Sequence, residues 1–168
     1  MIGGVSVRVR VSTHIAAPRR QVWARIRDLT THAEWMEEAA DIHIVGDRRS
    51  GRGTVMEVAT TVGPFRVTDR MEVDEWREGR SIGVRHVGKV RGGGRFLLRR
   101  SVLGGTRFTW DERLRFPWWL GGFAGERVGG VVLRRVWRRN LRQLKALVEG
   151  DRQGSGPTAL PERHPRSE

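Results

Sequence analysis

Hydrophobic and polar residues alternate strictly along residues 5–15. A period of two, built largely from β-branched residues, is typical of a strand with one buried face. The chain is therefore expected to begin with a half-buried strand. Its apolar side comprises Val5, Val7, Val9, Val11, Thr13 and Ile15, and its polar side comprises Ser6, Arg8, Arg10, Ser12 and His14.

Helical spacing replaces this alternation after Pro18, a residue that the first turn of a helix tolerates. Apolar residues at 22, 23, 26 and 29 predict a helix of about 18–28. Thr30 or Thr31 is then expected to cap a second short helix, because Glu34 stands three residues after Thr31 as in a capping box. This second helix is expected to end near Ala39.

A series of strand-like runs follows, separated by turn sequences such as Gly63-Pro64 and Gly104-Gly105. Connections this short permit only antiparallel pairing, because a parallel return needs a crossover of a dozen or more residues. The pattern predicts an antiparallel meander of six strands, with the first strand of the chain joining its edge. The expected strands are 41–46, 53–62, 65–76, 80–88, 94–103 and 106–116.

Residues 119–149 are predicted to form one long helix with an apolar stripe and an arginine-rich opposite face. At a rise of about 1.5 Å per residue its span is about 45 Å, enough to cross a sheet. From Gly150 onward the chain has few apolar residues and three prolines, so 150–168 is predicted to be a disordered tail after a single domain of 1–149.

These elements predict an α+β fold. The order is a strand, two short helices, a six-strand antiparallel meander and a long C-terminal helix. A helix with one apolar stripe is stabilised by packing that stripe on another element. We therefore expect the long helix to lie across the concave face of the sheet.

Composition narrows the class of protein. The absence of cysteine excludes disulfides and thiolate metal sites, and a formal charge of +13 comes almost wholly from arginine, with only Lys89 and Lys145 as lysines. Such an excess of positive charge is compatible with nucleic acid or an anionic surface as partner. Nucleic-acid binding is nevertheless not the favoured interpretation, because the basic residues do not cluster within a recognised binding motif.

The sequence also predicts where the protein resides. Arg8 and Arg10 interrupt the apolar core that a signal peptide requires. No run approaches the roughly 18 apolar residues of a transmembrane helix. We therefore expect a soluble, cytoplasmic protein without a transmembrane segment. Its oligomeric state is left open.

Several short motifs, in their order and spacing, resemble the START-like superfamily, also called SRPBCC, and especially its polyketide cyclase/dehydrase and lipid-transport branch. The resemblance covers about 5–149 and implies a helix-grip fold with a deep cavity between sheet and C-terminal helix. Members bind lipids, sterols, polyketides, quinones or plant hormones, and some catalyse cyclisation or dehydration; function varies within the fold. The motifs are Ile15-Ala16-Ala17-Pro18, Val22-Trp23, His32-Ala33-Glu34-Trp35, the run 104–110, Asn140-Leu141, Leu144-Lys145 and Glu149.

Four predicted strands each place one ionisable residue on an otherwise apolar face: Asp69, His86, Arg100 and Glu112. Buried charges are costly unless they are paired or face a wet cavity. We therefore predict a polar floor to an apolar pocket, where the carboxylates accept hydrogen bonds, His86 exchanges a proton and Arg100 binds a carbonyl or carboxylate. Alternatively, a bulge reverses the parity, or Arg100 only satisfies Glu112 at the sheet margin.

The long helix carries a second clue, since glycines at 121, 122, 125, 129 and 130 lie near its start. They either leave volume for a gate beside an aromatic cluster, allow close packing on the sheet, or belong to a loop. Trp23, Trp35 and Trp137 are predicted to be core residues. The expected ligand-binding residues are Asp69, Met71, His86, Phe96, Leu98, Arg100, Trp110, Glu112, Phe116, Trp119 and Phe123.

The sequence does not predict a metal site or a cofactor, because His14, His32 and His43 lack metal-ligand spacing. The favoured function is binding of an apolar small molecule such as a lipid or polyketide. An alternative is a polyketide cyclase or dehydratase with Asp69, His86 and Arg100 as candidate catalytic residues. A second alternative is an adaptor whose basic helix binds nucleic acid or an anionic membrane.

Overall fold

Seven strands pair into one antiparallel sheet in the part of the chain that the structure describes. The structure is a computed structural model that describes residues 5–62, 65–88, 90–116 and 122–154. The strand order is β1-β7-β6-β5-β4-β3-β2, so six strands follow one another as a meander and β1 closes the far edge against β7. This confirms the predicted topology. The strands are β1 (Val5–Ile15), β2 (Ala39–Val45), β3 (Val55–Val62), β4 (Phe65–Arg77), β5 (Ser81–His86), β6 (Arg91–Arg100) and β7 (Thr106–Phe116).

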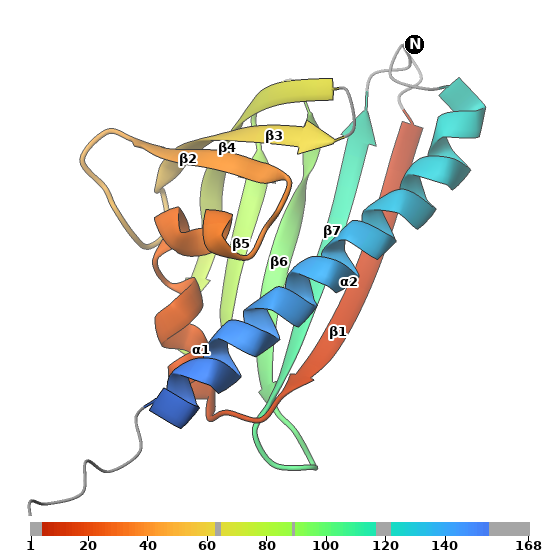
Figure 1. Cartoon of the computed structure of the whole chain (residues 1–168). Helices are drawn as coiled ribbons and strands as arrows, with labels where there is room; N and C mark the ends of the chain where they lie inside the picture. The colour runs from red at the N-terminus through yellow and green to blue at the C-terminus, as the bar shows by residue number, and fades with distance from the viewer. Residues whose placement is uncertain (1–4, 63–64, 89, 117–121, 155–168) are drawn as a thin grey trace, which may run out of the picture.

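The sheet curves around a single long helix, α2 (Gly122–Gly154), which crosses its concave side diagonally (Figure 1). Trp137, Leu141, Leu144 and Val148 of this helix are buried, whereas Arg134, Arg135 and Arg138 are exposed. The fold is therefore the predicted α+β helix grip. The described helix runs from Gly122 to Gly154, so residues 150–154 extend the helix and are not part of a tail. Residues 119–121 of the predicted helix and residues 155–168 of the predicted tail lie outside the described residues.

Two short helical segments connect β1 to β2 at one end of the sheet (Figure 1). The first, α1 (Arg19–Ile26), buries Val22, Trp23 and Ile26, as its spacing predicted. The second, η1 (Leu29–Glu34), is a 3₁₀-helix, and the predicted threonine cap is wrong. Asp28 is the N-cap instead, because its Oδ1 accepts the backbone N–H of Thr30 at 3.1 Å, while Glu34 forms an ion pair with Arg25.

β6 differs most from the prediction, since it begins at Arg91 and ends at Arg100 rather than spanning 94–103. Its first residues include Gly92 and Gly93, which lie between the expected strands 80–88 and 94–103. At the other end, the N–H of Gly104 donates to the carbonyl of Ser101, so the chain leaves the sheet there. Val102, which the expected strand 94–103 would have placed on the same face as Arg100, is consequently fully exposed.

The hydrophobic core lies between the concave face and α2 and includes residues of every element. Aromatic rings dominate one part of it: Trp110 of β7 stacks on Trp137 of α2 with ring centroids 4.8 Å apart, and Phe96 of β6 lies 5.2 Å from Trp110. Gly130 lies close above β1, where an added Cβ would sit 3.6 Å from Val7 Cγ1. A Cβ at this position would therefore make an ordinary van der Waals contact with the sheet. The side chains of residues 122–129 lie outside the described part.

Candidate functional site

A cavity of about 360 Å³ lies between the concave face of the sheet and α2. Ligand pockets for small molecules commonly enclose about 300–1,000 Å³ and are lined mainly by apolar side chains with a few placed polar groups. This cavity has that character. Its lining includes apolar side chains such as Met36, Met56, Met71, Phe96 and Trp137 and the ionisable residues Glu38, Asp69, His86 and Glu112.

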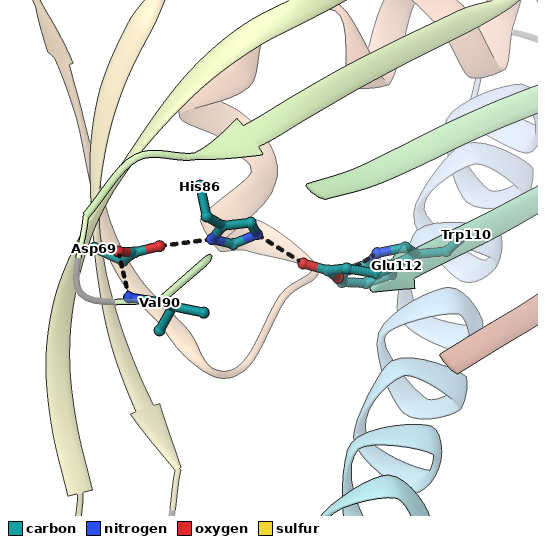
Figure 2. Close-up of polar contacts among 5 residues, drawn as sticks. All are labelled: Asp69, His86, Val90, Trp110 and Glu112. Carbon is teal, nitrogen blue, oxygen red and sulfur yellow. Dashed lines mark hydrogen bonds and ion pairs between the residues drawn. The ribbon is translucent and has the colours of Figure 1, made fainter. Parts of the chain in front are cut away.

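Three of these ionisable residues form a continuous hydrogen-bonded row across the sheet (Figure 2). His86 Nδ1 lies 2.6 Å from Asp69 Oδ2, and His86 Nε2 lies 3.0 Å from Glu112 Oε1. All three side chains are nearly inaccessible to solvent, with exposures of 4% for Asp69, 5% for His86 and 9% for Glu112. We name this row the Asp69–His86–Glu112 triad.

The carboxylate oxygens at the two outer ends of the triad also have hydrogen-bond partners. Asp69 Oδ1 accepts the backbone N–H of Val90 at 3.3 Å, and Glu112 Oε2 accepts the indole N–H of Trp110 at 2.8 Å (Figure 2). Trp110 stands two residues before Glu112 on the same face of β7, so the strand itself places donor and acceptor together. Every carboxylate oxygen of the triad therefore has a partner, as a buried charged group requires.

The two carboxylates decide the charge of His86. Burial lowers the pKa of His86, but hydrogen bonds to Asp69 and Glu112 and their negative charges outweigh burial and raise the pKa to about 9. At neutral pH the ring is therefore an imidazolium, and both ring N–H groups donate to carboxylates. The triad consequently holds one cation between two anions.

The register of the sheet explains why these residues meet. Asp69 precedes the direct partner of His86, Met71, by two residues, so Asp69 and His86 are diagonal neighbours on β4 and β5. Glu112 lies one strand farther away, because β6 runs between β5 and β7. Gly92 is opposite His86 and Gly94 is opposite Glu112, so the intervening strand carries no side chain at this point. The hydrogen bond between His86 and Glu112 spans this glycine gap.

Glu38 is a further carboxylate in the cavity lining, and Asn140 of α2 holds it. The Asn140 Nδ2 donates to both carboxylate oxygens of Glu38, at 2.7 and 2.8 Å, and Asn140 itself is fully buried. Burial raises the pKa of Glu38, the hydrogen bond from Asn140 opposes that rise, and the nearby charges of Glu112 and Glu37 add to it. The contact joins α2 to the residues that precede β2.

Arg100 does not belong to this site, contrary to the sequence-based expectation. It is exposed at the last residue of β6, four residues beyond Phe96, where the cavity lining on that strand ends. Four residues of strand extend about 13 Å at about 3.3 Å per residue. Arg100 therefore has the expected parity but lies beyond the end of the cavity, and no ion pair between Arg100 and Glu112 is present among the described interactions.

The remaining predicted ligand-binding residues divide into three groups. Met71, Phe96 and Trp110 line the cavity together with the triad. Leu98 is buried in the core but is not part of the lining. Trp119 lies outside the described residues, and so do the side chains of Phe116 and Phe123.

Sequence reasoning missed several residues of the lining. Trp137 was assigned to the core alone, yet it both packs on Trp110 and lines the cavity, whereas Trp23 and Trp35 are core residues only. Glu38 and His32 were not singled out because both belong to irregular or 3₁₀ segments, where strand parity does not apply. The run Gly92-Gly93-Gly94 was a usable signal, since consecutive glycines inside a strand often mark a close approach.

The described residues contain no group of three or more His, Asp or Glu side chains arranged to hold a metal ion. Among the described helices, none has the length of apolar sequence that crossing a bilayer requires. What the site offers is an apolar enclosure with acidic groups at its polar end. A curved sheet gripping a helix around such an enclosure defines the class of ligand-binding helix-grip proteins.

The chain belongs to the polyketide cyclase/dehydrase and lipid transport family, whose model matches residues 6–149. A comparison with curated proteins finds none that matches. Solved structures with the same fold include the Zhui aromatase/cyclase from Streptomyces sp. R1128. The two chains are 18% identical with a TM-score of 0.69, and the match covers 91% of this chain and 99% of the Zhui chain.

Two further solved structures are similar. The di-domain aromatase/cyclase StfQ from the steffimycin biosynthetic pathway has a TM-score of 0.72 at 15% identity, over 89% of this chain and 52% of its own. A protein from Thermus thermophilus has a TM-score of 0.67 at 17% identity, over 87% of this chain and 98% of its own. At such low identity these likenesses establish the fold alone.

Proposed function

We propose that this protein binds an apolar small molecule in the cavity between sheet and α2, with the Asp69–His86–Glu112 triad facing the polar end of the ligand. The observation that carries the proposal is the combination of a cavity of about 360 Å³ with a buried, fully hydrogen-bonded polar row in its wall. A tightly filled core would not retain such a void, because protein interiors pack to nearly crystalline density.

A cyclase or dehydratase activity is the second candidate, supported by the family and by the aromatase/cyclases of similar fold. A general base must have a free lone pair within reach of the proton that it abstracts. In the triad, however, both ring nitrogens of His86 face carboxylates, so His86 offers no free lone pair for this role. The arrangement therefore favours binding, since His86 has no free nitrogen in this state.

Binding is testable with 1-aminoanthracene, a neutral apolar fluorophore whose emission rises in a dry environment. We expect saturable binding to the wild type. Val67→Trp should weaken it at least tenfold, because Val67 lines the cavity and a larger side chain would fill it. Val87→Trp is the matched control, since Val87 is 46% exposed and lies outside the lining. Equal affinity in wild type and Val67→Trp would contradict the proposed site.

Catalysis is distinguished by a turnover assay on poly-carbonyl substrates with the variant Asp69→Asn. An enzyme should lose turnover while retaining affinity. A binding protein should show no turnover in either form, and only its affinity should respond to changes in the cavity.

A further inference from the structure

We propose that the cavity selects a neutral or cationic apolar molecule that carries a hydrogen-bond donor at one end, and discriminates against a carboxylate of the same size. The inference rests on the proposed binding function and specifies its ligand class. It follows from which polar atoms reach the cavity and which of them are already engaged.

The described lining holds six ionisable residues, of which three are acidic and three, His32, His86 and Arg95, are basic. Three carboxylates, those of Glu38, Asp69 and Glu112, line the cavity. The cation that faces them, His86, is already shared between two of the three, because each of its ring nitrogens contacts one carboxylate. The triad alone therefore carries a net negative charge, and Glu38 adds a further acidic group beside it.

The other two basic residues of the lining, Arg95 and His32, provide no free cation in the described part of the wall. The Arg95 guanidinium forms an ion pair with Glu75 at 3.0 Å, and 53% of the Arg95 side chain is exposed. The His32 Nε2 lies 2.7 Å from the carbonyl of Ile26, and burial lowers the pKa of His32 to about 4, so the ring is neutral. The indole of Trp110 donates to Glu112.

An anionic ligand would consequently be desolvated beside carboxylates, with no free cation among the described lining residues to pair with it, which is costly in a low-dielectric site. A ligand hydroxyl or ammonium group would instead find hydrogen-bond acceptors. Each carboxylate oxygen has two lone-pair directions, so Asp69, Glu112 and Glu38 can accept a ligand N–H or O–H in addition to their present partners. Arg100, which would have reversed this preference, is exposed beyond the end of the cavity.

Three naphthalene probes of one size test the inference at neutral pH: 2-naphthylmethylamine as the cation, 2-naphthalenemethanol as the neutral donor and 2-naphthoate as the anion. Their dissociation constants are measured by isothermal titration calorimetry with the full-length wild type. Because the net charge of +13 attracts anions to the surface non-specifically, each titration is repeated at low and high salt.

We expect the alcohol and the amine to bind at least tenfold more tightly than 2-naphthoate at both salt concentrations. Glu112→Gln, which removes one charge but keeps a carbonyl acceptor, should reduce that ratio to about threefold or less. Glu72→Gln is the control, because Glu72 pairs with Arg85 outside the cavity lining. Binding of 2-naphthoate as tightly as the alcohol in the wild type would overturn this inference and leave the binding function standing. Failure of all three probes and of 1-aminoanthracene would overturn the binding function itself.

Discussion

Gly94 on β6 is the direct cross-strand partner of Glu112 on β7, and a Cβ added to Gly94 would lie 3.1–3.3 Å from the Glu112 side chain. Glu112 cannot move away freely, because His86 and Trp110 both hold its carboxylate. The hydrogen bond between His86 and Glu112 can therefore cross β6 only where that strand has no side chain. This relationship makes a residue without any functional group a determinant of the site.

Replacing Gly94 should break the triad without disturbing the strand. Gly94→Val introduces a residue with high strand propensity, but its side chain would occupy the space beside the Glu112 carboxylate. We expect the pKa of His86 to fall below about 9, since one of its two carboxylate partners is displaced. Histidine proton NMR across a pH titration measures this change.

The control for Gly94→Val is Gly150→Ala on α2, where an added Cβ would meet no atom within 4 Å. This control should leave the titration of His86 unchanged. An unaltered His86 pKa in Gly94→Val would show that the valine is accommodated elsewhere and that the glycine gap is not required.

Stability should depend on pH through His86. Its folded-state pKa of about 9 is above the ordinary value of 6.5, so its contribution is fully present below pH 6.5 and is lost as pH rises through 9. A difference of about 2.5 pKa units corresponds to about 3 kcal/mol at about 1.4 kcal/mol per unit. Urea unfolding between pH 6 and pH 10 should therefore show the wild-type free energy of unfolding declining by roughly this amount.

The variant His86→Gln should flatten that decline, because it removes the titrating group. His43→Gln is the matched control, since His43 is exposed on β2, and it should retain the wild-type profile. A pH profile of His86→Gln that follows the wild type would assign the decline to other groups.

Asn140 should contribute measurably to the stability with which α2 is held on the sheet. Asn140→Leu leaves the Glu38 carboxylate without its two side-chain hydrogen bonds, and an unsatisfied buried polar group costs about 1–3 kcal/mol. We expect the free energy of unfolding to fall by that amount at neutral pH, measured by urea denaturation. Gln143→Ala removes a comparable but exposed hydrogen bond, from the next turn of α2 to Glu37, and should change stability by less than about 0.5 kcal/mol.

Arg100 should be dispensable for binding. Arg100→Ala is expected to leave the affinities for 1-aminoanthracene and 2-naphthoate within about twofold of the wild type, because the residue is exposed beyond the cavity. Fluorescence titration and calorimetry check this. A marked loss of affinity for 2-naphthoate alone would mean that Arg100 reaches an anionic ligand after all.

Strand parity explains why part of the site was accessible from the sequence. Side chains of a strand alternate between its faces, so the inward position of Asp69, His86 and Glu112 follows from their neighbours alone. A bulge reverses the faces of the residues on one side of it. The bulge in β4 lies between Val73 and Glu75, past Met71, so it does not change the face of Asp69. Outside regular strands the same rule has no force, and Glu38 and His32 were missed for that reason.

The sequence by itself determined the order of the elements, the antiparallel meander and the face on which each strand residue points, because these depend on local periodicity and on connections too short for a crossover. Only the tertiary structure decided which inward residues meet. Asp69, His86 and Glu112 come from three strands and touch because of register and a glycine gap, whereas Arg100 shares their parity but lies too far along β6. Parity is a property of one strand, but distance along and across the sheet is a property of all of them together.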